Sequence, residues 1–520
     1  MPTRIHDLVA DAATRRGDAP AVTAGHTTVT YAELWAQVAR VGVGLRRLGL
    51  RGGDRVAIHL DKRPETVSAI FGTSAAGGVF VPVNHLLHGP QVGHILRDAG
   101  ATTLVTTPRQ FERLAPILAD AAALRHVVLL GTTEPTARGH YRVTGWAALT
   151  AQPEPASPTA GGDEDPAAII YTSGSTGKPK GVVLSHRNLV LGAQSVNRYL
   201  GNTGDDVIAA LLPLSFDAGL SQLTTAFHVG AHVVLVNYLT AGEVVRVCAR
   251  HQVTGMTSVP PQWIQLAEVD WPPEATRRIR YFANTGGRLP QATLTRLRER
   301  MPHAKPYLMY GLTEAFRSTY LDPAEVDRRP DSIGRAIPNA EVMVLRPDGT
   351  PCDDDEPGEL VHCGPLVTMG YWNDPVATAE RFRPAPGTDP QRPEYAVYSG
   401  DLVVRDREGF LYFVGRADDM IKTSGYRVSP TEVEEACYDT GLVRDVVALG
   451  VADDRLGQQI VVVVTPAATD APFDPATLVA RLRRSVPSYM LPQRVLLRPE
   501  LPRGPNGKFD RARIRREVTT

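Results

Sequence analysis

The chain has 520 residues, of which 43% are hydrophobic and 22% charged, and this profile excludes a disordered or fibrous protein. Its 56 basic and 56 acidic residues cancel, so no overall charge attracts nucleic acid or an anionic membrane. Four scattered cysteines lack zinc-site or disulfide-framework spacing, and no export signal or membrane span is visible, which predicts a reduced, cytoplasmic protein with no membrane partner.

The first half of the chain alternates helical periodicity with short apolar runs. An amphipathic helix is predicted to begin at Tyr31, and a Pro-rich acidic loop is predicted at 151–165. Strands are predicted at 55–60, 78–83, 167–172, 182–184, 208–212 and 233–236. This alternation of strands and helices indicates a largely parallel sheet.

The pattern changes after residue 359, where short strands and turns indicate a small β subdomain. Beyond Asp418, an α+β unit is predicted, with helices at 431–438 and 475–485 and strands at 446–451 and 459–464. The predicted fold is therefore α/β. A large N-terminal domain (1–417) of parallel-sheet αβα subdomains and a small β subdomain is hinged to a small α+β C-terminal domain (418–520).

A loop rich in glycine and hydroxyl residues lies between two predicted strands, at residues 171–181. Glycines let backbone N–H groups approach a ligand, and with hydroxyls and two of the chain's six lysines they form a cradle for anions. It is not a Walker A loop, because Pro179 follows Gly177-Lys178. The loop is predicted to bind phosphate through Thr172, Ser173, Gly174, Ser175, Thr176, Gly177 and Lys178.

Five further residues are candidates for nucleotide chemistry. Glu314 offers a carboxylate suited to Mg²⁺, and Tyr310 can stack on a purine. Asp401 can accept both ribose hydroxyls, and Arg416 offers a planar fork to ribose or phosphate. Lys508, on a turn near the end of the chain, can stabilise charge in a transition state. Taken singly, each residue also has an ordinary structural explanation. Glu314 fits a helix start, Tyr310 fits core packing, and Asp401 fits a turn. Arg416 fits a surface salt bridge, and Lys508 fits a solvated tail.

Together these segments resemble the adenylate-forming superfamily, which includes acyl-CoA synthetases, peptide-synthetase adenylation domains and firefly luciferase. The resemblance covers residues 31–511 and keeps the family order. The matching segments are the 171–181 loop, the adenine and magnesium segment 310–314, the ribose segment 398–401, the hinge 415–419, the thiolation loop 424–434 and the lysine loop 505–510.

The resemblance implies a two-step reaction with ATP, Mg²⁺ and a phosphopantetheine thiol. A carboxylate attacks the α-phosphate of ATP and gives acyl-AMP and pyrophosphate, with Lys508, Glu314 and Thr172 as catalytic residues. The C-terminal domain then turns about Asp418, which removes Lys508 and brings in the Gly425 loop to form a thiol channel. Besides the loop and the residues named above, Gly286, Gly287, Gly311 and Thr313 are implied to bind ATP or AMP.

The family's acid pocket is also implied residue by residue. It corresponds here to Phe216, Asp217, Ser221, Gln262, Thr285, Gly286, Met309, Gly311, Arg317 and Ser318. Asp217 occupies the position where amino-acid-activating domains carry an aspartate that pairs with the substrate ammonium. A buried carboxylate needs a cationic partner. In one alternative Arg317 is that partner, and the pocket is merely polar. In the other, Asp217 binds a substrate ammonium, and Arg317 binds a second polar or anionic group of the substrate.

The expected function is adenylation of an amino acid, with a β-amino acid or an amino dicarboxylic acid as options. The thiol acceptor is expected in trans, on a discrete carrier protein. The alternative is an AMP-forming acyl-CoA ligase that transfers a non-amino acyl group to free CoA. A catalytically dead adenylate-binding protein is disfavoured because Glu314, Asp401 and Lys508 occur together.

Overall fold

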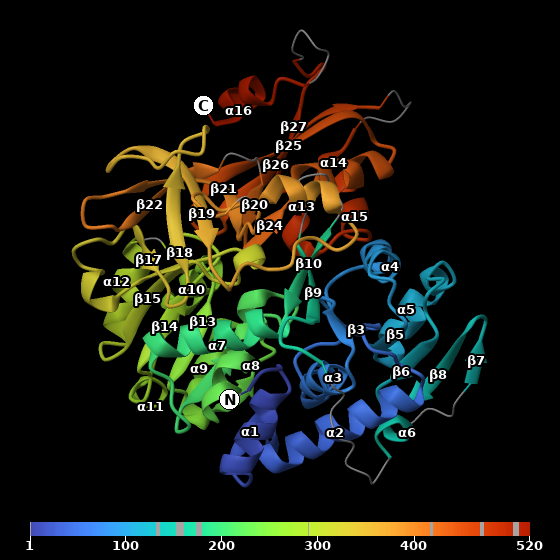
Figure 1. The fold of residues 1–520 in the computed structure, drawn as a ribbon. Coiled ribbons are helices and arrows are strands. Elements are labelled where there is room, and N and C mark those ends of the chain that lie inside the picture. The colour runs from blue at the N-terminus through green and yellow to red at the C-terminus, as the bar shows by residue number, and fades with distance from the viewer. Residues whose placement is uncertain are drawn as a thin grey trace.

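A computed structural model gives the fold, a mixed α/β arrangement with a large N-terminal and a small C-terminal domain (Figure 1). The predicted fold class is thus confirmed. The structure describes residues 2–131, 136–151, 161–172, 179–289, 291–389, 391–416, 420–467, 473–502 and 509–519. The predicted domain boundary at Asp418 lies outside these residues and stays a prediction.

The first sheet of the large domain has eight strands and confirms the predicted parallel core. Its central strands β9, β4, β3, β5, β6 and β8 run parallel, and the outer strands β10 and β7 are antiparallel to their neighbours. The strand order is β10 (Lys180–Ser185), β9 (Pro166–Thr172), β4 (Val79–Pro82), β3 (Arg55–His59), β5 (Thr103–Thr106), β6 (His126–Leu129), β8 (Tyr141–Gly145) and β7 (Thr136–Arg138).

The second sheet joins the other parallel strands to the predicted β subdomain. In order, it runs β18 (Glu341–Leu345), β19 (Pro357–Cys363), β21 (Tyr395–Arg405), β22 (Leu411–Arg416), β17 (Ser332–Ala336), β16 (Thr319–Leu321), β15 (Lys305–Tyr310), β14 (Tyr281–Asn284), β13 (Gly255–Ser258), β11 (Val207–Ala210), β12 (His232–Leu235), β1 (Pro20–Ala24) and β2 (Thr27–Thr30), with β20 (Phe382–Pro384) on β21. Strands β1 and β11–β15 pair in parallel, whereas β16–β22 pair antiparallel. The β subdomain therefore continues one edge of the parallel sheet.

Helices of the large domain cover both sheets, and local capping explains where several begin. The helix that starts at Tyr31 has a capping box, because Thr30 accepts from the Glu33 backbone and Glu33 accepts from the Thr30 N–H. The helices are α1 (Asp7–Arg16), α2 (Tyr31–Arg47), α3 (Pro64–Ala75), α4 (Gly89–Asp98), α5 (Pro108–Leu118), α6 (Trp146–Thr150), α7 (His186–Leu200), α8 (Asp217–Val229), α9 (Ala241–His251), α10 (Pro260–Ala267), α11 (Pro273–Thr276), α12 (Gln291–Arg300) and α13 (Pro375–Arg381), with 3₁₀ turns η1 (Thr313–Ala315) and η2 (Pro323–Glu325).

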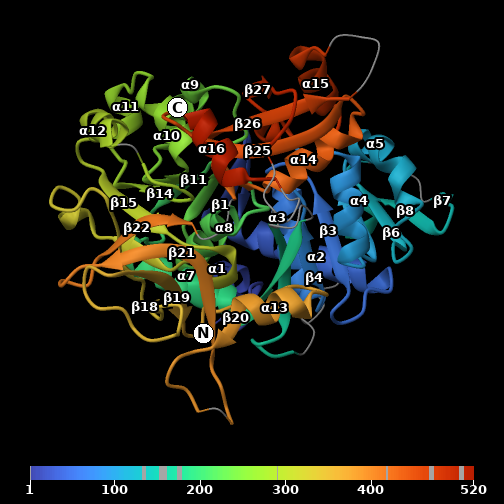
Figure 2. The same ribbon diagram turned by 90° about the horizontal axis from the view of Figure 1, so that it is seen from above.

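The C-terminal domain has its own sheet and core, as the α+β pattern predicted. Its strand order is β24 (Tyr426–Val428), β23 (Ile421–Thr423), β26 (Gly457–Pro466) and β25 (Val443–Asp453), with β27 (Arg494–Leu497) parallel to β26. The remaining elements are α14 (Pro430–Asp439), α15 (Pro475–Leu482), η3 (Ser488–Met490) and α16 (Arg511–Thr519). In both views the side of this domain that carries α14 and α15 lies next to α4 (Figures 1 and 2), and the Gln91 side chain of α4 contacts the Met490 sulfur at 3.8 Å.

Several predicted boundaries differ from the structure by one to three residues, and local contacts explain two of the differences. The strand predicted to reach Leu212 ends at Ala210, because the Leu211 N–H donates to the Gln222 side chain instead of to a neighbouring strand. Helix α15 ends at Leu482, whose carbonyl accepts from the Ser485 N–H in a turn. Asp401, expected at a strand start, lies inside β21 after Gly400, which has a φ of +65°.

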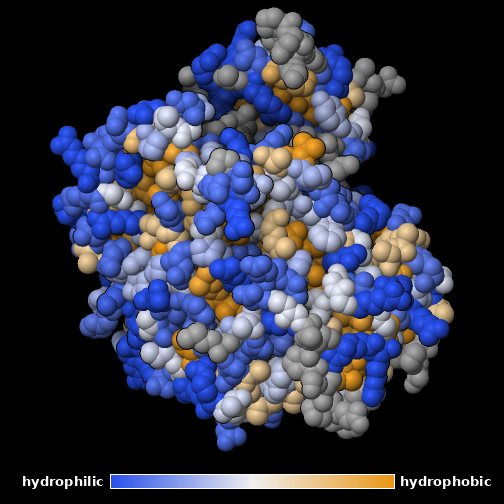
Figure 3. Space-filling view, viewed as in Figure 1, coloured by the Kyte–Doolittle hydropathy of each residue, from blue (hydrophilic) through white to orange (hydrophobic). Residues whose placement is uncertain are grey.

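The surface agrees with the composition. The face in Figure 3 is mostly hydrophilic, with hydrophobic residues in small separate groups. Within the described ranges, no helix is long and apolar enough to cross a membrane. All four cysteines are buried and none forms a disulfide, as their spacing predicted.

Candidate active site

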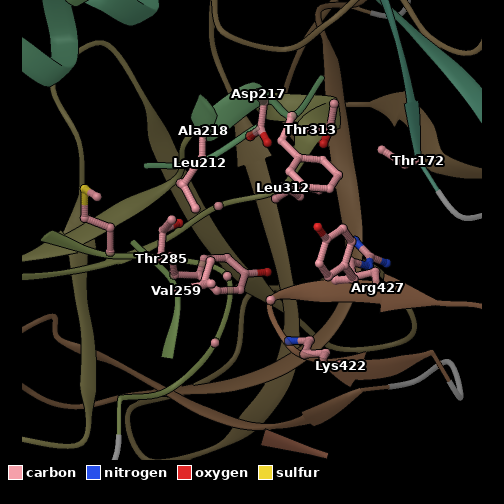
Figure 4. A pocket seen from close by; sticks show the side chains of 18 of the residues that line it. Thr172, Leu212, Asp217, Ala218, Val259, Thr285, Leu312, Thr313, Lys422 and Arg427 are labelled. Carbon is pink, nitrogen blue, oxygen red and sulfur yellow. The ribbon is translucent and has the colours of Figure 1, made fainter. Parts of the chain in front are cut away.

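A cavity of about 580 Å³ lies where the C-terminal domain meets the ends of the central strands of the large sheet (Figure 4). It is lined from the large domain by the ends of β14 and β15 and the start of α8, and from the small domain by β23, β24 and η3. Most predicted site residues within the described chain line it: Thr172, Phe216, Asp217, Gln262, Thr285, Gly286, Gly287, Met309, Tyr310, Gly311, Thr313, Arg317, Asp401 and Gly425.

Three predicted residues are not part of the cavity lining. Ser221 is buried in α8, where its carbonyl accepts from the Thr225 hydroxyl at 2.5 Å. Ser318 is also buried, and its hydroxyl shares a hydrogen bond of 3.0 Å with the Nδ1 of His362. Glu314 lies behind the lining with 4% exposure. Ser173 to Lys178, Asp418, Lys508 and the side chain of Arg416 lie outside the described residues.

Glu314 is a buried carboxylate with one oxygen available for a further partner. Its Oε1 accepts a hydrogen bond of 2.6 Å from the Tyr371 hydroxyl, while its Oε2 has no hydrogen-bond partner among the described residues. Burial acts to raise the pKa of Glu314, but the positive charges of Arg381 and Arg427 outweigh it and lower the pKa below its usual value. The carboxylate is therefore ionised, and Oε2 suits a cation.

The chemistry of Glu314 fits a magnesium ion bound together with a nucleotide. Mg²⁺ usually takes one or two protein carboxylates, and its other ligands are phosphate oxygens and water. No group of three or more metal-ligating side chains occurs in the described part of the chain. An ion at Glu314 would therefore complete its coordination with groups other than side chains of such a cluster, and phosphate oxygens and water are suitable.

Tyr310 and Asp401 bring the adenine and ribose segments together. The Tyr310 hydroxyl donates to Asp401 Oδ2 at 2.5 Å, although 91 residues separate the two in the chain. Burial and the neighbouring Asp401 charge raise the pKa of Tyr310 well above its usual value, so the phenol stays protonated. The hydrogen bond fixes the aromatic ring beside a carboxylate. This pair can present a flat apolar face to a purine and an acceptor to a ribose hydroxyl.

Asp217 and Arg317, the two charged residues of the acid side, do not pair with each other. No ion pair within 4.0 Å joins them, and Arg317 Nη1 instead donates to the Thr285 hydroxyl. Asp217 is the first residue of α8, and burial raises its pKa despite the charge of Arg317. The pocket therefore holds a carboxylate and a guanidinium as separate polar groups. Of the two alternatives left open by the sequence, direct pairing is excluded.

The predicted thiolation loop lies against the acid side of the cavity. Gly425 has a φ of +81°, and a Cβ built on it would lie 2.5 Å from Val259 Cγ2. A Cβ on Gly286 would lie 3.8 Å from the Gly425 carbonyl oxygen. Glycine is thus required at 425 by both the backbone conformation and the close approach to the large domain. The loop therefore packs closely against Val259 and Gly286 of the large domain.

Several cavity residues from the C-terminal domain were not singled out by the sequence analysis, although Tyr426 and Arg427 belong to the predicted thiolation loop 424–434. Tyr426 stacks on Tyr489 at 3.5 Å between ring centroids and meets the edge of Phe216 at 5.2 Å. Arg427 and Lys422 also line the cavity, and Figure 4 shows Lys422 on the side opposite Asp217. The aromatic and basic character of 422–427 was visible in the sequence, but no local signal linked Tyr489 to it.

Comparisons with known proteins show the family to which the chain belongs. Residues 9–372 match the AMP-binding enzyme family, and residues 432–508 match the AMP-binding enzyme C-terminal domain. The feruloyl-CoA synthase of an Amycolatopsis species is 32% identical over 503 residues, 96% of each chain. A linear gramicidin synthase of Brevibacillus parabrevis is 30% identical over 98% of this chain, but over only 6% of that protein.

A solved structure supports the same assignment. A double mutant of the o-succinylbenzoate CoA synthetase of Bacillus subtilis matches with a TM-score of 0.82 and 26% identity, over 98% of this chain and 97% of the other. The likeness spans both domains, and the family matches reach the loop that carries Lys508. The chain therefore belongs to the AMP-binding enzyme family and is an adenylate-forming acid–thiol ligase.

Proposed function

We propose that this chain activates a polar carboxylic acid with ATP and transfers the acyl group to the thiol of coenzyme A. The observation that carries the proposal is a single cavity lined by the nucleotide pair Tyr310–Asp401, the acid-side residues Asp217 and Thr285, and the Gly425 loop. The end-to-end similarity to feruloyl-CoA synthase supports CoA as the acceptor. This similarity favours the CoA alternative over the discrete carrier protein that was expected first.

In the first step, an oxygen of the acid attacks the α-phosphorus of ATP, and the bond from that phosphorus to the pyrophosphate oxygen breaks. Tyr310 and Asp401 hold the nucleoside, and Thr172 and the following loop hold the departing phosphates. Glu314 would hold Mg²⁺, which would supply positive charge to neutralise the phosphates. Lys508 adds a positive charge as the negative charge moves from the acid to the pyrophosphate.

In the second step, the thiol sulfur attacks the acyl carbonyl carbon of the acyl-AMP. The bond from that carbon to the AMP oxygen breaks, and the thiol proton leaves to solvent. The contact of Gly425 with Val259 and its approach to Gly286 supports entry of the thiol along this loop. The rotation predicted about Asp418 would alternate Lys508 and Gly425 at the same cavity.

The acceptor is tested by measuring AMP release and thioester formation with free CoA. With ATP, Mg²⁺ and an activated acid, CoA is expected to raise the rate of AMP release at least about 10-fold, because thiolysis empties a site otherwise occupied by tightly held acyl-AMP. Mass spectrometry should detect the acyl-CoA. Accumulation of acyl-AMP that free CoA does not discharge would contradict the proposal and favour a carrier protein.

A second candidate function, adenylation of an amino acid for a carrier protein, is favoured by Asp217. Its carboxylate lines the cavity, and no cationic side chain of the described residues lies within 4.0 Å of it. A substrate ammonium would supply the missing partner. Under this function, β-amino acids and amino dicarboxylic acids would be activated, and the similarity to a gramicidin synthase segment supports such a reading.

The Asp217→Asn variant separates the two candidates. If an ammonium pairs with Asp217, this variant is expected to lower kcat/KM for amino acids at least about 100-fold in acid-dependent ATP–pyrophosphate exchange, because it removes the charge but keeps the side-chain shape. Acids of the same length without the amine serve as the matched control and should change less than about 3-fold. Wild-type exchange confined to acids without an amine would exclude the second candidate.

A further inference from the structure

Arg317 is a buried cation at the acid side of the cavity, and among the described residues it has no acidic partner. Its exposure is 3%, and its Nη1 donates to the Thr285 hydroxyl. Its Nε is buried without a hydrogen-bond partner, and no carboxylate within the described ranges lies within 4.0 Å of the guanidinium. A buried guanidinium is costly unless an anion compensates it. The bound acid is the component that can bring this anion.

The backbone and packing around Arg317 fix the position of its side chain. Phe316, directly before it, is buried with a φ of +59°, a conformation that a non-glycine residue adopts only when its surroundings enforce it. A Cβ on Gly192 would lie 2.4 Å from the Phe316 ring, so the ring is closely packed against α7. A Cβ on Gly311 would lie 3.3 Å from Arg317 Cδ, so the aliphatic part of the Arg317 side chain lies close to the backbone of Gly311, which has no side chain.

The charge of Arg317 acts on Asp217 at the acid side of the cavity. It lowers the pKa of Asp217 against the stronger effect of burial, and it acts in the same direction on the buried Tyr199. The positive charges that act on Glu314 are those of Arg381 and Arg427. The reacting carboxylate must reach the α-phosphate near Glu314, so a different group of the substrate is needed at Arg317.

We propose that Arg317 and Thr285 bind a second anionic group of the acid, so that the substrates are dicarboxylic acids activated at one end. This inference rests on the proposed function, because it names a group on the acid that is adenylated. It holds for either thiol acceptor. The guanidinium would bind the distal carboxylate through Nε and a terminal nitrogen, and Thr285 would hold the fork in place.

The test compares straight-chain dicarboxylic acids of four to eight carbons with their monomethyl esters in ATP–pyrophosphate exchange. The ester keeps the length but removes the second charge. The wild type is expected to prefer the best diacid over its ester by at least about 100-fold in kcat/KM. Arg317→Met should remove this preference by lowering the diacid value at least about 100-fold while changing the ester value less than about 3-fold. Retained ester exchange shows that the variant is folded.

Two further variants sharpen the result. Arg317→Lys should recover part of the diacid preference, because the charge remains while the fork is lost. Thr285→Val should lower the diacid value about 10-fold through the loss of one hydrogen bond. If Arg317→Met lowers kcat/KM equally for the diacid and its ester, Arg317 binds the reacting carboxylate and the proposal is overturned. It is also overturned if the wild type activates the diacid and its ester equally well.

Failure of the proposed function would give a different pattern. No acid of any class would then support exchange in the wild type. A thermal-shift measurement needs no turnover and separates the two cases. If the diacid raises the Tm of the wild type, but its ester does not, and the diacid does not raise the Tm of Arg317→Met, the anion site is supported even without catalysis. Identical Tm shifts in the wild type and in Arg317→Met would overturn the proposal.

Discussion

The Glu314→Gln variant is expected to form acyl-adenylate about 100 to 1,000 times more slowly than the wild type. Glutamine keeps the size of the side chain and an oxygen that can accept from the Tyr371 hydroxyl, but it removes the negative charge. Glu314 Oε2 is buried and has no partner among the described residues, so a magnesium ion bridging to ATP would lose its protein carboxylate. Acid-dependent ATP–pyrophosphate exchange, measured over a range of Mg²⁺ concentrations, checks the result.

The control for this prediction is Tyr371→Phe. It removes the hydrogen bond to Oε1 but leaves the charge of Glu314, so the rate should fall less than about 10-fold. A Glu314→Gln variant that retains near-wild-type exchange at the same Mg²⁺ concentration would show that the metal is held elsewhere. Equal losses in both variants would mean that Glu314 acts through the local structure and not through its charge.

The Gly425→Leu variant is expected to lose thioester formation at least about 100-fold while acyl-adenylate formation changes less than about 3-fold. A side chain at 425 would collide with Val259, since a Cβ alone would lie 2.5 Å from Val259 Cγ2, and the φ of +81° disfavours any other residue. The collision belongs to the orientation described here. In the orientation predicted for adenylation, the loop would have rotated away, and the substitution is expected to be tolerated there.

The matched variant is Lys508→Ala, for which the opposite pattern is expected. Acyl-adenylate formation should fall about 100-fold or more, while thioester formation from supplied acyl-AMP should stay within about 3-fold of the wild type. Rapid-quench measurement of each half-reaction checks both variants. Parallel losses of both steps in either variant would contradict domain alternation at a single site.

The order of the elements and the nature of the chemistry could be predicted from the sequence because both depend on local patterns. The capping box at Thr30 and the apolar runs at β3 and β9 act over a few residues, so periodicity finds them. The glycine and hydroxyl loop after Thr172 predicts a phosphate site by its composition, and this stays a prediction. The ends of β11 and α15 were misplaced because side-chain and turn hydrogen bonds terminate them.

The sequence by itself indicated the fold class and the adenylate-forming chemistry, and most of the predicted site residues that the structure describes line the cavity, because motifs keep their residue types wherever the chain folds. Only the tertiary structure decided that Asp217 and Arg317 stay apart, that Tyr310 bonds Asp401, and that Tyr489 supports Tyr426. These contacts join residues far apart in the chain. Their distances follow from how the sheets and domains pack, and no local pattern encodes that geometry.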